Sequence, residues 1–73
     1  MNELRLKKSE IKKIENKENF DVYEFHVERP LYFPKKYKTD LILDKKRIGL
    51  IIINECNPDE NSSSGKFTLI NKY

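Results

Sequence analysis

Hydrophobic and polar residues alternate in two segments of this chain, and the alternation predicts β-strands. In residues 20–28, apolar side chains at every second position give the segment one apolar and one polar face. Residues 66–73 repeat this pattern at the end of the chain. The inward residues predicted from the two segments are Tyr23, Phe25, Val27, Phe67, Leu69 and Tyr73. Both segments are therefore expected to be strands with one face in a core.

Residues 39–43 and 48–54 predict a β-hairpin in the middle of the chain. The short connection between them begins with Asp44, and Asp favours the first position of a type I turn. The second strand of this hairpin contains apolar residues at consecutive positions rather than at alternate ones. Because a half-exposed strand alternates apolar with polar residues, this strand is expected to be covered on both sides.

The two faces of this hairpin follow from the pairing of its strands. We expect Leu43 to lie opposite Ile48. The face assigned to the core then consists of Leu41, Leu43, Ile48, Leu50 and Ile52. The other face contains Ile51 and Ile53, and its cover is expected to be another segment or a partner molecule.

The N-terminal residues 3–19 fit two interpretations. Apolar residues at helical spacing and a suitable N-cap at Ser9 favour a short helix. A strand through Ile11 and Ile14 that ends in a turn at 16–19 fits the same residues, because Asn tolerates turn geometry. Both interpretations stay open.

Two further segments are predicted as connections. Pro30 and Pro34 favour an extended segment over residues 29–38, and the polar residues 55–65 predict a mobile loop. The sequence therefore predicts one small domain over residues 1–73, mainly β, with an antiparallel sheet or barrel-like fold of four to five strands. An α+β class with a short N-terminal helix is the alternative.

The amino-acid composition indicates the cellular compartment and the origin of the protein rather than its function. Cys56 is the single cysteine, so an intrachain disulfide is excluded and a reducing, cytoplasmic compartment is expected. The chain shows no apolar stretch of the ~18–20 residues that span a membrane. Lys, Asn and Ile are frequent and Ala is absent, a usage typical of AT-rich coding. We therefore expect an origin in a low-GC bacterium, its phages or its mobile elements.

Catalytic chemistry is not predicted. One histidine, His26, and one cysteine do not make a zinc motif, and two glycines do not make a phosphate-binding loop. The neighbours of Cys56 are neutral or acidic and offer no base or cation to activate its thiol, which argues against a nucleophile. We expect no catalytic residues, no metal, no cofactor and no enzyme activity.

The segment 32–38 is the best candidate surface, because it interleaves aromatic and cationic side chains. The predicted partner-binding residues add the basic hairpin tip and the second face of the hairpin: Tyr32, Phe33, Lys35, Lys36, Tyr37, Lys38, Lys45, Lys46, Arg47, Ile51 and Ile53. Aromatic anchors suit protein recognition. The first hypothesis is a small protein-binding module, for example a phage or mobile-element inhibitor of a host defence or nuclease complex.

The alternative hypothesis is a small barrel that binds nucleic acid. Its lysines would neutralise phosphates, and its aromatic rings would stack on unpaired bases. A homodimer, formed through the second hairpin face or an edge strand, also stays open.

Overall fold

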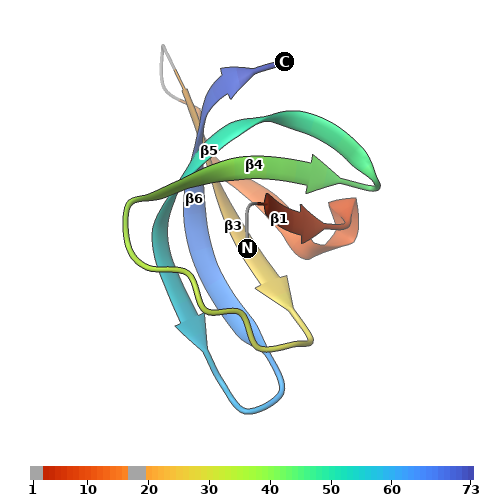
Figure 1. Ribbon diagram of the computed structural model, residues 1–73, viewed down its shortest axis with the longest axis vertical. Helices are drawn as coiled ribbons and strands as arrows, with labels where there is room; N and C mark the ends of the chain where they lie inside the picture. Colours follow the sequence, from red (N-terminus) through yellow and green to blue (C-terminus); the bar gives the residue numbers. More distant parts are fainter. Residues whose placement is uncertain (1–2, 17–19) are drawn as a thin grey trace.

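A single curled sheet of six strands forms the part of the protein that the computed structural model describes, residues 3–16 and 20–73 (Figure 1). The strands are β1 (Glu3–Leu6), β2 (Ile11–Asn16), β3 (Asp21–Val27), β4 (Tyr37–Leu43), β5 (Lys46–Pro58) and β6 (Ser63–Lys72). A three-residue 3₁₀ helix, η1 (Lys8–Glu10), lies between β1 and β2. The predicted mainly β fold is confirmed, with six strands where four to five were expected.

The strand order shows why the sheet must curl. The order is β1-β4-β5-β6-β3-β2, so the consecutive strands β1 and β2 lie at opposite edges. A flat sheet of this size would separate its edges by about 24 Å, since neighbouring strands lie about 4.8 Å apart. The chain from Leu6 to Ile11 spans at most about 19 Å. The edges are therefore drawn toward each other, and the sheet takes the barrel-like shape visible in Figure 1.

The inner face of the curl holds the core. Its buried side chains are Leu4, Leu6, Phe25, Val27, Leu31, Phe33, Leu41, Ile51, Ile53, Phe67 and Leu69. The ring of Phe67 stacks on Tyr23 with a centroid distance of 5.4 Å and packs against Phe25 at 6.1 Å. The inward positions predicted for β3 and β6 are thus confirmed, except that Tyr73 is exposed.

A glycine makes this aromatic packing possible. A Cβ atom at Gly65 would lie 2.2 Å from the Glu55 carbonyl oxygen and 2.9 Å from the Phe25 ring. Gly65 pairs directly with Phe25 across β6 and β3, so the ring occupies the space that a side chain would take. The close approach of these strands therefore depends on a residue without a Cβ.

The central hairpin has a different turn from the predicted one. Asp44 and Lys45 have φ angles of 51° and 68° and form a two-residue turn, as expected for type I′ geometry. Leu43 consequently pairs with Lys46, and Thr39 pairs with Ile51. The predicted pairing of Leu43 with Ile48 is wrong by up to two residues, because the turn is shorter than the four residues assumed.

A β-bulge next to the turn, where Ile42 pairs with Arg47 but Leu41 pairs with Gly49, shifts the remaining pairs by one residue and exchanges the faces of β5. Ile51 and Ile53 point into the core and are 0% exposed, whereas Leu50 and Ile52 lie on the outer face. The prediction that Leu50 and Ile52 belong to the core is therefore wrong. Leu41 is buried as predicted, and the half-buried Leu43 and Ile48 pack against the core.

The N-terminal segment contains two strands rather than a helix. The strand interpretation is right for β2, while only the short η1 is helical. β1 was not predicted; it pairs in parallel with β4, from Glu3 opposite Asp40 to Leu6 opposite Leu43. The sheet is therefore mixed and not purely antiparallel. Most of the turn predicted at 16–19 lies outside the described residues.

The connection between β3 and β4 is fixed by side chains of the β5–β6 hairpin. The Ser63 hydroxyl accepts a hydrogen bond from the Leu31 amide (2.6 Å) and donates one to the Arg29 carbonyl (2.9 Å). The Cys56 thiol donates to the Leu31 carbonyl at 3.3 Å. These contacts hold Leu31 and Phe33 over one end of the core.

The loop predicted over residues 55–65 is shorter than expected. β5 continues to Pro58 and β6 begins at Ser63, so residues 59–62 form the connection. The Asp59 amide donates to the Ser62 carbonyl at 2.7 Å and closes this turn.

Candidate protein-binding surface

The aromatic and lysine segment presents less aromatic surface than its sequence suggests. Tyr32 is 78% exposed, but Phe33 is only 9% exposed. The Tyr37 ring is half-buried and packs on Phe33 with a centroid distance of 5.7 Å. Lys35, Lys36 and Lys38 are exposed. Of the three predicted aromatic residues, Tyr32 alone offers a fully accessible ring.

The hairpin tip does not extend this segment. Lys45, Lys46 and Arg47 are exposed, as a surface role requires. They lie at the far end of β4, however, and the seven positions from Lys38 to Lys45 correspond to about 23 Å of extended strand. The predicted basic residues therefore form two separate clusters.

The apolar residues of β5 that face solvent are not the predicted ones. Ile51 and Ile53 are core residues, so neither contacts a partner while the sheet is intact. Leu50 and Ile52 are half-buried on the outer face. Thr68 lies directly between Ile52 and Val22 in the ladder, and Ile70, at a β-bulge beside Leu50, is 36% exposed.

We call this set of outward aliphatic residues the outer strip. It consists of Val22, Leu50, Ile52 and Ile70. A two-residue turn alone would still place Leu50 and Ile52 on the face of Leu41, and it is the β-bulge between Leu41 and Ile42 that turns them outward. The prediction missed it because a displacement by one residue exchanges the two faces.

A polar cluster borders the outer strip. Asp40 pairs directly with Leu50 and receives a hydrogen bond from the Tyr73 hydroxyl at 2.7 Å. An Arg47 guanidinium nitrogen lies 3.5 Å from the second Asp40 oxygen. The hydrogen bond to the Asp40 carboxylate raises the pKa of Tyr73, and burial and the negative charge of Asp40 act in the same direction. The cluster fixes the chain end beside the strip, together with a bond from the Tyr73 amide to the Ile48 carbonyl.

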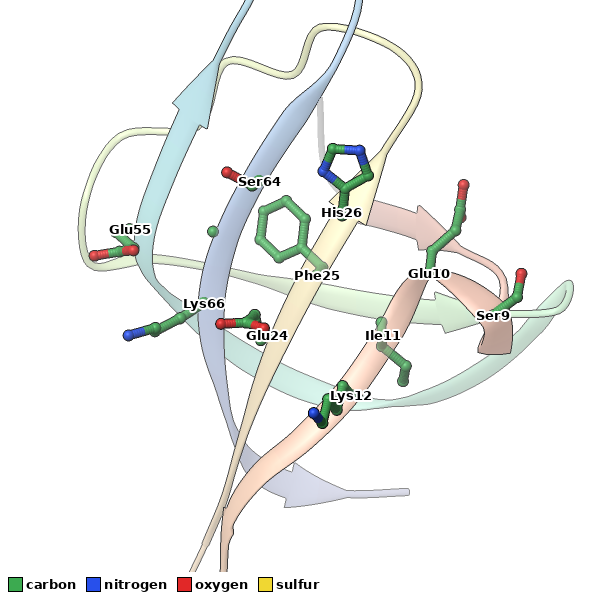
Figure 2. Close-up of a pocket in the computed structure, with 11 residues that line it drawn as sticks. Ser9, Glu10, Ile11, Lys12, Glu24, Phe25, His26, Glu55, Ser64 and Lys66 are labelled. Atoms are coloured by element: carbon green, nitrogen blue, oxygen red, sulfur yellow. The ribbon is translucent and has the colours of Figure 1, made fainter.

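A hollow on β2, β3, β5 and β6 is the other feature with polar side chains, and Figure 2 shows it. Its charges alternate across the strands, because Lys12 faces Glu24, Glu24 faces Lys66, and Lys66 faces Glu55. Opposite charges that face each other stabilise strand pairing by about 0.2–1 kcal/mol per pair. The charged side chains of the hollow are therefore explained by their role in strand pairing.

His26 at the rim of this hollow is engaged locally. Its Nε2 lies 3.2 Å from a Glu28 carboxylate oxygen, and both side chains are largely exposed. Among residues 3–16 and 20–73, no group of three or more His, Cys, Asp or Glu side chains is arranged to hold a metal ion. Nor does any helix in that part of the chain have the length and apolar character needed to cross a membrane.

Comparisons with protein-family models, with curated proteins and with solved structures find no match to this chain.

Proposed function

We propose that this protein is a non-enzymatic protein-binding module whose contact surface includes the outer strip. The observation that carries the proposal is the distribution of aliphatic residues on β5. The inner residues Ile51 and Ile53 are fully buried, while Leu50 and Ile52 on the other face are covered only in part. Because the sheet is a single curled layer, its inner face is covered by the chain itself and its outer face stays accessible to another molecule.

The expected energy of this contact is moderate. About a third or less of each side chain of the outer strip is accessible, so burying it contributes less than about 1 kcal/mol per residue. The four residues of the outer strip would supply a small apolar centre, and the neighbouring Asp40, Arg47 and Tyr73 a polar rim. This composition suits a regulated or transient contact.

An inhibitor of phage or mobile-element origin, directed at a host defence or nuclease complex, is the specific form of this proposal. Its support is the small size of the chain and its Lys-, Asn- and Ile-rich composition. An inhibitor that blocks a larger protein needs a contact surface and no catalytic group.

The proposal is tested by affinity capture with crosslinking from a low-GC bacterial lysate treated with nuclease. Ile52→Glu places a charge in the outer strip, opposite Lys38, where it does not repel its neighbour. Asn57→Glu adds the same charge on an exposed part of β5 and is the control. Wild type and the control should capture the same proteins, and Ile52→Glu should lose them. Equal capture by all three proteins, or by none, would contradict the proposal.

Nucleic-acid binding is the second candidate, favoured by the exposed Tyr32 beside Lys35, Lys36 and Lys38. Three phosphate contacts predict a slope of about −2 for log affinity against log salt on single strands. Replacing the three lysines with Glu should abolish gel retardation of a single-stranded oligonucleotide. The burial of Phe33 removes one of the stacking faces that this function requires, which is why protein binding is preferred.

A further inference from the structure

A basic cleft lies where β1 meets the tip of the β4–β5 hairpin. It has a volume of about 380 Å³, and its lining side chains come from three separate parts of the chain. The cationic members are Arg5, Lys7, Arg29 and Lys45. A second cleft, which shares Arg5 and Arg29, continues along β1 to Glu3. The parallel pairing of β1 with β4 brings these residues together.

The floor of the basic cleft is aliphatic. Ile42 is 8% exposed, lies outside the core cluster and pairs with Arg5 on one side and Arg47 on the other. Leu6, a core residue that is 4% exposed, also borders the cleft. On the outer face Ile42 follows Asp40 by two residues, and Asp40 pairs with Leu50. The floor therefore lies on the same face of β4 as the residue that pairs with the end of the outer strip.

The two carboxylates of the cleft are already engaged by the chain itself. Glu10 accepts a hydrogen bond from the Lys7 amide at 2.8 Å and lies 3.7 Å from the Arg29 guanidinium. Asp44 accepts a bond from the Lys8 amide at 3.4 Å. The ammonium groups of Lys7 and Lys45 form no ion pair within the part of the chain that the structure describes. Positive charge is thus left for a ligand.

We propose that the basic cleft binds an extended acidic segment of the partner protein, in which carboxylates flank an aliphatic side chain. The carboxylates pair with Lys7 and Lys45, and the aliphatic side chain packs on Ile42. This inference rests on the proposed function and names the chemistry of the partner. It extends the contact surface from the outer strip to the free edge of the sheet.

The lining favours a peptide over a nucleic acid. None of the eight lining residues is aromatic, so the cleft offers no ring for a base to stack on. Recognition also differs from the addition of a strand to a sheet edge. The Arg29 guanidinium donates to the Arg5 carbonyl and so occupies a backbone acceptor of β1. We therefore expect the side chains of the cleft, rather than the backbone of β1, to recognise the ligand.

Fluorescence anisotropy with labelled synthetic peptides tests this proposal. The probe is a short peptide that alternates glutamate with leucine, compared with one that alternates glutamate with serine. We expect saturable binding of the first at low salt and at least tenfold weaker binding of the second. A single-stranded oligonucleotide serves as a competitor and should not displace the first peptide.

Two variants localise the site. The double variant Lys7→Glu and Lys45→Glu should weaken binding of the leucine peptide at least tenfold. Lys35→Glu with Lys38→Glu makes the same charge change away from the cleft, at the other end of β4, and should change affinity less than twofold. Ile42→Thr, which keeps a β-branched residue in the strand, should weaken binding about threefold. Circular dichroism confirms that each variant is folded.

The outcomes separate this inference from the proposed function. Equal weakening by both double variants, absence of peptide binding, or displacement by the oligonucleotide would overturn the acidic-segment proposal. Ile52→Glu should leave peptide binding unchanged, because it changes the outer strip and not the cleft. Loss of captured protein with Ile52→Glu but not with the Lys7/Lys45 variant would retain the binding module and reject the cleft.

Discussion

The two faces of β5 differ in what the protein itself does with similar side chains. Ile51 and Ile53 on the inner face are enclosed by their own chain, whereas Leu50 and Ile52 on the outer face are enclosed only in part. Hydrophobicity therefore does not distinguish a core residue from a surface residue in this strand; position relative to the curl does. The inner face should determine stability, and the outer face should determine binding.

Alanine substitutions on the two faces test most directly whether inner and outer residues of β5 differ in their contribution to stability. Ile51→Ala should lower the free energy of unfolding by about 2–5 kcal/mol, because it leaves a cavity in a packed core. Ile52→Ala should lower it by about 1 kcal/mol or less. Urea denaturation measures both changes. If Ile51→Ala does not fold, Ile51→Val replaces it in the experiment and should lower the free energy of unfolding by about 0.5–1.5 kcal/mol. Equal costs on both faces would contradict the assignment.

Gly65 and Ser64 are adjacent in β6 and allow the same comparison between a buried and an exposed position. Gly65→Ala should cost up to about 3 kcal/mol, because its Cβ would lie 2.2 Å from the Glu55 carbonyl oxygen and force β5 and β6 apart. Ser64→Ala, on the exposed face of the same strand, should change stability by less than about 0.5 kcal/mol. Thermal denaturation compares the two. A Gly65→Ala variant as stable as wild type would show that the strands adjust to the added methyl group.

Thr39 is an inner-face residue whose substitution should stabilise the protein rather than destabilise it. Its side chain is buried, and its hydroxyl has no hydrogen-bond partner within residues 3–16 and 20–73. Thr39→Val replaces this hydroxyl with a methyl group of similar size and should raise the free energy of unfolding by about 1 kcal/mol. Urea denaturation is the measurement. A loss of stability would mean that the hydroxyl is satisfied in solution.

The smallest effect concerns the polar border of the outer strip. The Asp40 carboxylate raises the pKa of Tyr73, so Asp40→Asn should lower that pKa toward the ordinary value of about 10. Because the folded-state pKa is the higher one, the Tyr73 contact stabilises the protein below the unfolded pKa and is lost as pH rises through the folded pKa. Ultraviolet titration of the tyrosines follows this change. An unchanged titration would place the Tyr73 hydroxyl away from Asp40.

Local patterns in the sequence were enough to predict β3, β4, β5 and β6, but not β1 or the pairing of the strands. Alternation identified β3, β6 and the central hairpin, because a strand with one buried face needs an apolar residue at every second position. The turn at Asp44 and Lys45 set the first pair of the hairpin, and the β-bulge between Leu41 and Ile42 set the faces of β5. Backbone angles with positive φ at non-glycine residues are not visible in composition, and so the register was assigned wrongly.

Non-local pairing explains the rest of what the sequence did not reveal. β1 has only four residues, and its partner β4 lies more than thirty residues further along the chain. The basic cleft depends on this pairing, since it brings Arg5 and Lys7 to Lys45. The tip residues Lys45, Lys46 and Arg47 were predicted as a surface from local charge alone, but their neighbours across the fold could not be predicted.

The parallel pairing of β1 with β4 also bears on how the protein is made. Leu41 is synthesised 37 positions after its partner Leu4. At about 5–20 residues per second, this delay lasts about 2–7 s. During that interval β1 has no strand to pair with, so its apolar residues stay outside the sheet until the hairpin that receives them has been made.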